Sequence, residues 1–168
     1  MTAPVDPMNG LAARESAFRL GSLHLRPAAT HPLLRACARN DDTGPVLCYI
    51  IVEGSQVTAM VNFRPRMPLV DGIPAYNIEL AVPEDRRGGG RGKEAVSAAL
   101  LELRHELARA GVPAFDIEAI VETDNPASMR IAEETICENA VPTTDPYSGK
   151  RAFRYLRRLE SPVSPPAA

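Results

Sequence analysis

The sequence lacks the features that mark several large classes of protein. No apolar run in its 168 residues approaches the roughly 20 residues that a membrane-spanning helix needs. The formal net charge is −2 and the isoelectric point is about 5.9, so the basic bias typical of proteins that bind nucleic acid or membrane surfaces is missing. The start, MTAPVDPMNG, has neither the basic first part nor the apolar core of a secretory signal, so a cytoplasmic location is expected.

Metal-binding and disulfide patterns are missing too. The three cysteines, at positions 37, 48 and 137, form no Cys-x-x-Cys pair, and the three histidines form no His-x-x-x-His pair. No metal site is therefore expected. Cys48 and Cys137 fall in apolar stretches, which favours buried and unreactive thiols. Nothing in the sequence indicates the low-pKa environment that a cysteine nucleophile requires.

What is present fits an ordinary globular protein. Apolar residues make up 45% of the chain and charged residues 24%. A chain of this length is typical of one domain and buries about two-thirds of its unfolded surface. Proline-rich and alanine-rich ends without periodicity predict disordered tails over 1–15 and 161–168, which leaves a single domain over 16–160.

The first half of that domain is predicted to be mostly strands. Thr30 suits a helix N-cap and Pro32 a first helical turn, which favours a short helix there. The predicted elements are, in order, a strand at 17–27, a short helix at 30–40, a hairpin of strands at 46–53 and 57–64, a proline-rich loop at 65–74 and a strand at 75–82.

The second half contains the clearest helix pattern of the chain. Its apolar residues recur at helical spacing and the pattern ends at Gly111; they are Val96, Ala99, Leu100, Leu103, Leu107 and Ala110. Glu102 and His105 fall on the other faces, where solvent is expected. A strand at 114–123, a helix that starts at Pro126 after the N-cap Asn125, and a closing hairpin around DPYSG follow. This order predicts a mixed α/β protein with one parallel crossover.

A glycine-rich stretch, VPEDRRGGGRGKEA at residues 82–95, joins the strand at 75–82 to this helix. Helix N-termini carry free N–H groups and partial positive charge, and glycines let a phosphate approach the backbone. A phosphate site is therefore favoured over a flexible linker. A Walker A loop is excluded because Lys93 is followed by Glu94, and a dinucleotide fingerprint is excluded because it needs glycine at position 93.

The spacing Arg87-x-x-Gly90-x-Gly92 resembles the Arg/Gln-x-x-Gly-x-Gly/Ala motif of the GCN5-related N-acetyltransferases (GNAT). NPASMRIAEE, which begins at Asn125, resembles a stretch of the ribosomal-protein-acetylating branch of that family. The order of elements agrees from about residue 17 to 159. The resemblance implies an α/β (α+β) fold: a mixed, mostly antiparallel sheet with a splayed central pair of strands and flanking helices.

The resemblance also implies an activity and a donor site. The expected reaction is direct transfer of the acetyl group of acetyl-coenzyme A to a primary amine, on a small molecule or a protein, without a metal. The residues expected to hold coenzyme A are the backbone of Leu80, Ala81 and Val82, the turn residues Arg87, Gly88, Gly89, Gly90, Arg91, Gly92 and Lys93, and the helix-start residues Asn125 and Ser128.

Two side chains are implied as catalytic. Glu79 lies where many relatives carry a general base, although a solvated glutamate beside the cofactor is an equal alternative; Glu118 and Glu122 are weaker candidates. Ser128 matches a candidate acid, with a serine that only satisfies the helix backbone as its alternative. The tyrosine usual on this helix is missing, and Tyr147 and Tyr155 of the last hairpin are the tyrosines that could replace it.

Other functions stay open on the sequence. The missing tyrosine and a short region between the first two strands favour a non-catalytic coenzyme-A-binding sensor or interaction module as the main alternative. An unrelated binder of nucleotide phosphates is a third possibility. The acceptor amine cannot be read from the sequence, and its cleft is either open or completed by the 64–74 loop or by a second subunit in a homodimer.

Overall fold

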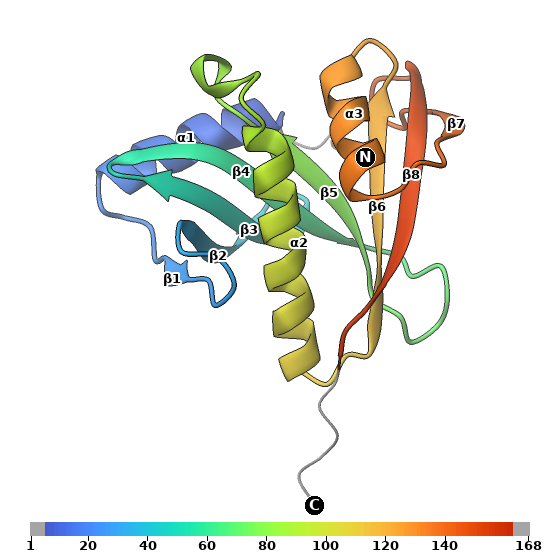
Figure 1. The fold of residues 1–168 in the computed structure, drawn as a ribbon, viewed down its shortest axis with the longest axis horizontal. Helices are drawn as coiled ribbons and strands as arrows, with labels where there is room; N and C mark the ends of the chain where they lie inside the picture. The colour runs from blue at the N-terminus through green and yellow to red at the C-terminus, as the bar shows by residue number, and fades with distance from the viewer. Residues whose placement is uncertain (1–5, 163–168) are drawn as a thin grey trace, which may run out of the picture.

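A computed structural model describes residues 6–162 of the chain (Figure 1). Its elements are α1 (Pro7–Arg19), β1 (Arg26–Pro27), β2 (Leu34–Asp41), β3 (Gly44–Glu53), β4 (Gln56–Arg66), β5 (Ala75–Ala81), the short 3-10 helix η1 (Glu84–Arg86), α2 (Arg91–Arg109), β6 (Ala114–Glu122), α3 (Pro126–Thr135), β7 (Val141–Thr144) and β8 (Arg151–Glu160). No helix within these residues is both long and apolar enough to cross a membrane.

The strands form one sheet in the order β1-β2-β3-β4-β5-β6-β8-β7. All neighbours are antiparallel except β5 and β6, which α2 connects as a parallel crossover. The two strands pair only at their first residues, from Ala75 opposite Asp116 to Asn77 opposite Glu118, and then diverge. The expected fold class, a mixed and mostly antiparallel sheet with a splayed central pair, is confirmed.

The helices cover the two faces of the sheet unequally. α2 and α3 lie on one face, and α1 lies on the other, across β4 and β5 (Figure 1). Each face has its own apolar core: Phe63 and Phe115 are fully buried beneath α2 together with Leu103 of that helix, whereas Leu11 of α1 packs with Met60. Strands β6, β8 and β7 therefore have no helix of the described chain on the face that α1 covers elsewhere.

The second half of the chain and the central hairpin follow the sequence predictions. β3 and β4 form the predicted hairpin, β5 and β6 match the predicted strands, and α2 ends before Gly111. Asn125 caps α3, because its Oδ1 accepts a hydrogen bond from the Ser128 N–H at 3.1 Å. The closing β7–β8 hairpin is also as predicted.

The prediction of a short helix at 30–40 is wrong. Residues 34–41 form β2, which pairs residue by residue with β3. The cap-like Thr30 has a different partner: its N–H and its Oγ1 donate to Glu102 Oε2 at 2.9 and 2.7 Å. The strand predicted at 17–27 is also wrong for most of its length, because only Arg26–Pro27 pair with β2.

Glu102 is correspondingly not the solvated residue expected from the helix pattern, whereas His105 is exposed as predicted. The Glu102 side chain is 0% exposed and also accepts a hydrogen bond from the Ala29 N–H at 3.0 Å. Although burial opposes the effect, the hydrogen bonds from Ala29 and Thr30 lower the pKa of Glu102. The buried carboxylate thus anchors the loop that leads into β2.

The predicted N-terminal tail is wrong from residue 7 onward. Asp6 caps α1 by accepting a hydrogen bond from the Met8 N–H at 2.9 Å, and Leu11 is only 3% exposed. Packing against the sheet stabilises this helix, and its proline stands at the first helical position, where proline is favoured. Residues 1–5 and 163–168 lie outside the described residues; at the other end, Ser161 is still buried. That the chain forms a single domain stays a prediction.

Candidate functional site

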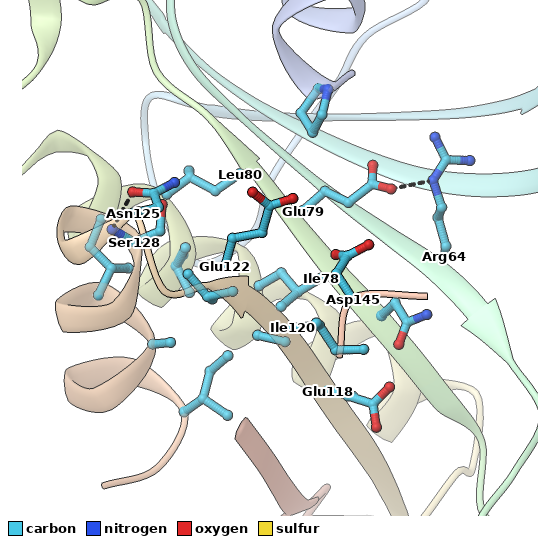
Figure 2. Close-up of a pocket in the computed structure, with 18 of the residues that line it drawn as sticks. Arg64, Ile78, Glu79, Leu80, Glu118, Ile120, Glu122, Asn125, Ser128 and Asp145 are labelled. Carbon is cyan, nitrogen blue, oxygen red and sulfur yellow. Dashed lines mark hydrogen bonds and ion pairs between the residues drawn. The ribbon is translucent and has the colours of Figure 1, made fainter. Parts of the chain in front are cut away.

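The divergence of β5 and β6 opens a cleft of about 740 Å³ (Figure 2). Because side chains alternate between the faces of a strand, the two sides of this cleft differ in chemistry. The side toward α2 and α3 is apolar, and its residues are Ile78, Leu80, Val96, Ala119, Val121, Ile131, Ala132 and Ile136. The other side is charged, and its residues include Asp6, Arg64, Arg66, Glu79, Glu118, Glu122, Asp124 and Asp145.

Glu79 points into the charged side and both of its oxygens are engaged (Figure 2). Arg64 Nε donates to Oε1 at 2.6 Å, and Asn62 Nδ2 donates to Oε2 at 3.2 Å. The Glu79 side chain is 15% exposed, so water reaches it only in part. To take a proton from an amine, Glu79 would use the second lone pair of one of these oxygens. Its role as a base stays a prediction.

Arg64 is itself fixed from the β2–β3 turn. Its Nη1 lies 2.7 Å from Asp41 Oδ2 and donates to Thr43 Oγ1 at 2.7 Å. Although burial opposes the effect, the hydrogen bonds to Glu79 and Asp41 raise the pKa of Arg64. Burial alone would raise the pKa of Asp41. The hydrogen bonds from Thr43 and Arg64 outweigh burial, so the pKa of Asp41 is lowered. A chain of ionised groups thus leads from the turn into the cleft.

The two weaker base candidates are also engaged. Glu118, only 6% exposed, accepts a hydrogen bond from Arg154 Nε at 2.5 Å and forms an ion pair with Arg66. Glu122 Oε2 lies 2.8 Å from Lys150 Nζ, and this hydrogen bond lowers the pKa of Glu122. In both carboxylates it is Oε2 that makes these contacts.

The predicted helix-start residues do reach the cleft. Asn125 and Ser128 line it at the first turn of α3, on the same side as Leu80 (Figure 2). Of the two tyrosines considered, Tyr147 lines the cleft from the β7–β8 turn, where it is 51% exposed. Tyr155 is fully buried, is not part of the cleft, and burial raises its pKa. Tyr147 is therefore the tyrosine that the fold brings to the site.

The glycine turn needs glycine for two different reasons. Gly88 and Gly90 have φ angles of +83° and +78°, which L side chains rarely adopt, and a Cβ on either would meet open space. Gly92 is tightly packed instead: a Cβ would lie 2.7 Å from Ile131 Cδ1 and 3.2 Å from Leu80 Cδ2. Since both of those side chains line the cleft, the turn at the start of α2 adjoins the apolar side.

Most of the positive charge around the turn is already paired. Arg91 lies 2.5 Å from Glu53 and 2.6 Å from Glu94, and Lys93 lies 2.8 Å from Glu134. Within residues 6–162, Arg87 forms no ion pair, and its Nε donates to the Val82 carbonyl at 3.0 Å. Of the predicted basic residues, Arg87 is the one whose charge is available.

The main chain of β5 also offers a group to the cleft. The Pro74 carbonyl accepts a hydrogen bond from Asp116 of β6, so alternate residues from Pro74 onward direct their main-chain groups toward β6. Leu80 is one of them, and β6 has already diverged at that level, since the last pair is Asn77–Glu118. Ala81 is opposite Met60 and faces β4 instead. The Leu80 N–H and C=O therefore face the cleft.

Several cleft residues were not anticipated from the sequence. Arg64 and Arg66 come from β4, and Asp6 from the start of α1. Arg64 is opposite Asn77 in the β4–β5 pairing, next to the Asn62–Glu79 pair. The sequence does not predict this register, because the 67–74 loop separates the two strands. No group of three or more His, Cys, Asp or Glu in the described part of the chain could hold a metal ion.

No protein-family model and no curated protein matches this sequence. Solved structures do match. An acetyltransferase of the GNAT family from Streptococcus pneumoniae aligns at a TM-score of 0.50 with 10% identity, over 68% of this chain and 67% of that one. A ribosomal-protein-S5-alanine acetyltransferase from Vibrio fischeri aligns at 0.51 with 12% identity, over 71% of this chain and 64% of that one, less than two thirds of its length. At such identities the likeness concerns architecture: the resemblance found in the sequence extends to the structure, and this chain has the GNAT acetyltransferase fold.

Proposed function

We propose that this protein belongs functionally to the GNAT acetyltransferases and transfers the acetyl group of acetyl-coenzyme A to a primary amine by direct transfer. The observation that carries the proposal is the glycine turn, open at Gly88 to Gly90, at the N-terminus of α2 and next to the cleft between the diverging strands. Such a terminus is suited to a pyrophosphate.

The donor would lie on the apolar side. The free N–H groups at the start of α2 and the unpaired Arg87 would hold its pyrophosphate. Its arm would run past the main chain of Leu80, which faces the cleft, and past Asn125 and Ser128 on α3. Gly92 keeps α2, α3 and β5 close enough together to form this wall.

Acetyl-coenzyme A supplies a thioester carbon that an amine can attack. The Leu80 N–H would donate a hydrogen bond to the thioester oxygen, which gains negative charge during the attack. Glu79 would take the proton of the amine, either directly or through water, on an oxygen that Asn62 or Arg64 also contacts. Ser128 or Tyr147 would supply a proton to the leaving sulfur, since both line the same cleft.

The acceptor would enter from the charged side, where Glu79 lies. A protein amine is consistent with the name of the Vibrio fischeri neighbour, and a small amine with the open cleft. Residues 6–162 form the cleft without a second subunit, so a homodimer is not required by it. Dimerisation and cytoplasmic residence both stay predictions.

The test has two stages. Titration calorimetry with coenzyme A and acetyl-coenzyme A should show binding, and ATP should bind more weakly; the absence of coenzyme A binding at millimolar concentration would end the proposal. A thiol-release assay against a panel of amines should then show turnover. Binding without turnover on any amine would favour the non-catalytic sensor, which the engaged Glu79 and the absence of tyrosine from α3 make the second candidate.

A further inference from the structure

Two cysteines that the proposed reaction does not use lie directly opposite each other. Cys37 of β2 and Cys48 of β3 are partners in the antiparallel register, so their side chains point to the same face. Opposed Cα atoms in antiparallel strands are about 4.5 or 5.5 Å apart, and both values lie within the roughly 4.4–6.8 Å that a disulfide spans. Both thiols are free, with exposures of 8% for Cys37 and 1% for Cys48.

The surroundings of this pair are electropositive as well as apolar. α1 covers the thiols with Leu11, and two arginines lie close by: Arg14 on α1, and Arg39 on β2, whose Nη1 also pairs with Asp41 Oδ2 at 3.1 Å. The Nε atoms of both arginines are buried and have no hydrogen-bond partner within residues 6–162. Reactive cysteines are found in positively charged sites that are partially exposed, whereas a buried structural thiol is inert, and Cys37 is the more exposed of the two thiols.

The ionisation of the pair is correspondingly unequal. A hydrogen bond from Cys48 lowers the pKa of Cys37 to about 7; burial opposes this shift, and the charges of Arg14 and Arg39 support it. The hydrogen bond with Cys37, together with burial, raises the pKa of Cys48. Cys37 is thus the sulfur suited to attack as a thiolate, and Cys48 stays a thiol.

We propose that Cys37 and Cys48 form a redox site at which small peroxides generate a reversible disulfide within the chain. The Cys37 thiolate attacks one peroxide oxygen, the O–O bond breaks, and the departing hydroxide takes up a proton to become water. The Cys48 sulfur then attacks the sulfenic sulfur of Cys37, the S–O bond breaks, and a second water leaves with the Cys48 proton. The two thiols lose two electrons in total, and hydrogen peroxide is reduced to two waters.

This site is separate from the cleft but connected to it by the sheet. Cys48 is opposite Asn62 on β4, and Asn62 is opposite Glu79 on β5. Neither cysteine lines the cleft. The proposal therefore does not depend on acetyl transfer, and its test reads the thiols directly.

The test uses the full chain, reduced, desalted and exposed to hydrogen peroxide. Thiols counted after denaturation should fall from three to one, and the intact mass should drop by two hydrogen atoms. Digestion with trypsin should give a link between peptides 36–39 and 40–66, which a reducing agent releases. A chain that keeps three thiols, or that loses thiols only by linking Cys137 between molecules, would overturn the proposal.

Single substitutions then distinguish the role of each residue in disulfide formation. Cys137→Ser should still lose two thiols. Cys48→Ala should form no internal disulfide and should leave a sulfenic acid on Cys37 that dimedone traps. Arg14→Leu should slow the loss of thiols several-fold, and Arg14→Lys, which keeps the charge, should restore it; equal rates in both would contradict an electrostatic role for α1.

Discussion

The two sides of the cleft differ in whether their polar groups are free. On the α2–α3 side, the turn at Gly88 to Gly90 borders open space, and the Leu80 main chain faces a gap that β6 has left. On the other side, the carboxylates Glu79, Glu118 and Glu122 are each paired with an arginine or a lysine of the chain itself. One side is thus ready to bind, whereas the carboxylates of the other side already have partners within the chain.

This difference has an energetic consequence. A ligand on the apolar side gains contacts to groups that lose only water. A ligand on the charged side competes with ion pairs such as Arg64–Glu79, whose side chains are 12% and 15% exposed. Removing one partner of so enclosed a pair leaves the other charge without compensation. Substitutions on the two sides should therefore change different measurements.

The largest effect is expected from a negative charge on the donor side. In Gly90→Asp, the new carboxylate would stand at the N-terminus of α2 with open space before it, where a pyrophosphate would lie. We expect the Kd for coenzyme A to rise by about 100-fold or more, that is about 2.7 kcal/mol. Calorimetry measures this directly.

Gly90→Asn is the matched control. Asparagine has the same size and tolerates the positive φ of +78° about as well, so it isolates the charge from the backbone strain. Asparagine should weaken coenzyme A binding by less than about tenfold. Equal losses in the two variants would mean that the turn holds no phosphate.

The next effect should appear on the charged side and only in turnover. Glu79→Gln keeps the shape and the acceptor for Arg64. Its new amide faces Asn62 Nδ2, so the Asn62 amide must turn over to accept with Oδ1, which is buried without a partner among the described residues. We expect kcat to fall by about 100-fold, typical of a lost general base, while the Kd for coenzyme A stays unchanged. Glu122→Gln is the control with little effect; a kcat independent of Glu79 at every pH would remove it as the base.

A smaller effect on stability should come from Arg64. Arg64→Gln would leave Asp41 and Glu79 without their shared partner, because Arg64 lies 2.7 and 2.6 Å from them. We expect a loss of about 2 kcal/mol in the free energy of unfolding, measured by urea titration. The affinity for coenzyme A should not change. A variant as stable as the wild type would show that the pair is replaced by water.

The same contrast explains which parts of the site can be predicted from the sequence. The donor side can be predicted from the sequence because it depends on local features: the glycine spacing, the helical spacing of apolar residues in α2 and the Asn125 cap. The charged side depends on pairing across strands, such as Arg64 next to Glu79, which no local pattern contains. The sequence of β2 predicts a helix for the same reason: Thr30 resembles an N-cap in the local sequence, whereas its N–H and Oγ1 donate to Glu102, far along the chain.

A pH titration tests the start of the Asp41–Arg64–Glu79 chain. The pKa of Asp41 is lowered in the folded state, so its stabilising contribution is present above its ordinary pKa of about 3.9 and is lost as the pH falls below that value. Asp41→Asn should cost about 1 kcal/mol at neutral pH and flatten the stability profile in that acid range. Parallel profiles for the two proteins would place the acid sensitivity at other carboxylates.

The smallest effect is expected at the rim of the charged side, at Lys150. Its Nζ lies 2.8 Å from Glu122 and 3.3 Å from Asp124, and its side chain is 58% exposed. Exposed pairs of this kind add little to stability, so Lys150→Gln should leave the melting temperature nearly unchanged. The substitution does uncover two carboxylates of the cleft, and a cationic acceptor from the amine panel should then show a lower KM at low salt but not at high salt. Lys150→Arg should keep the wild-type KM. If Lys150→Gln changes the Kd for coenzyme A instead, the two sides of the cleft are not independent.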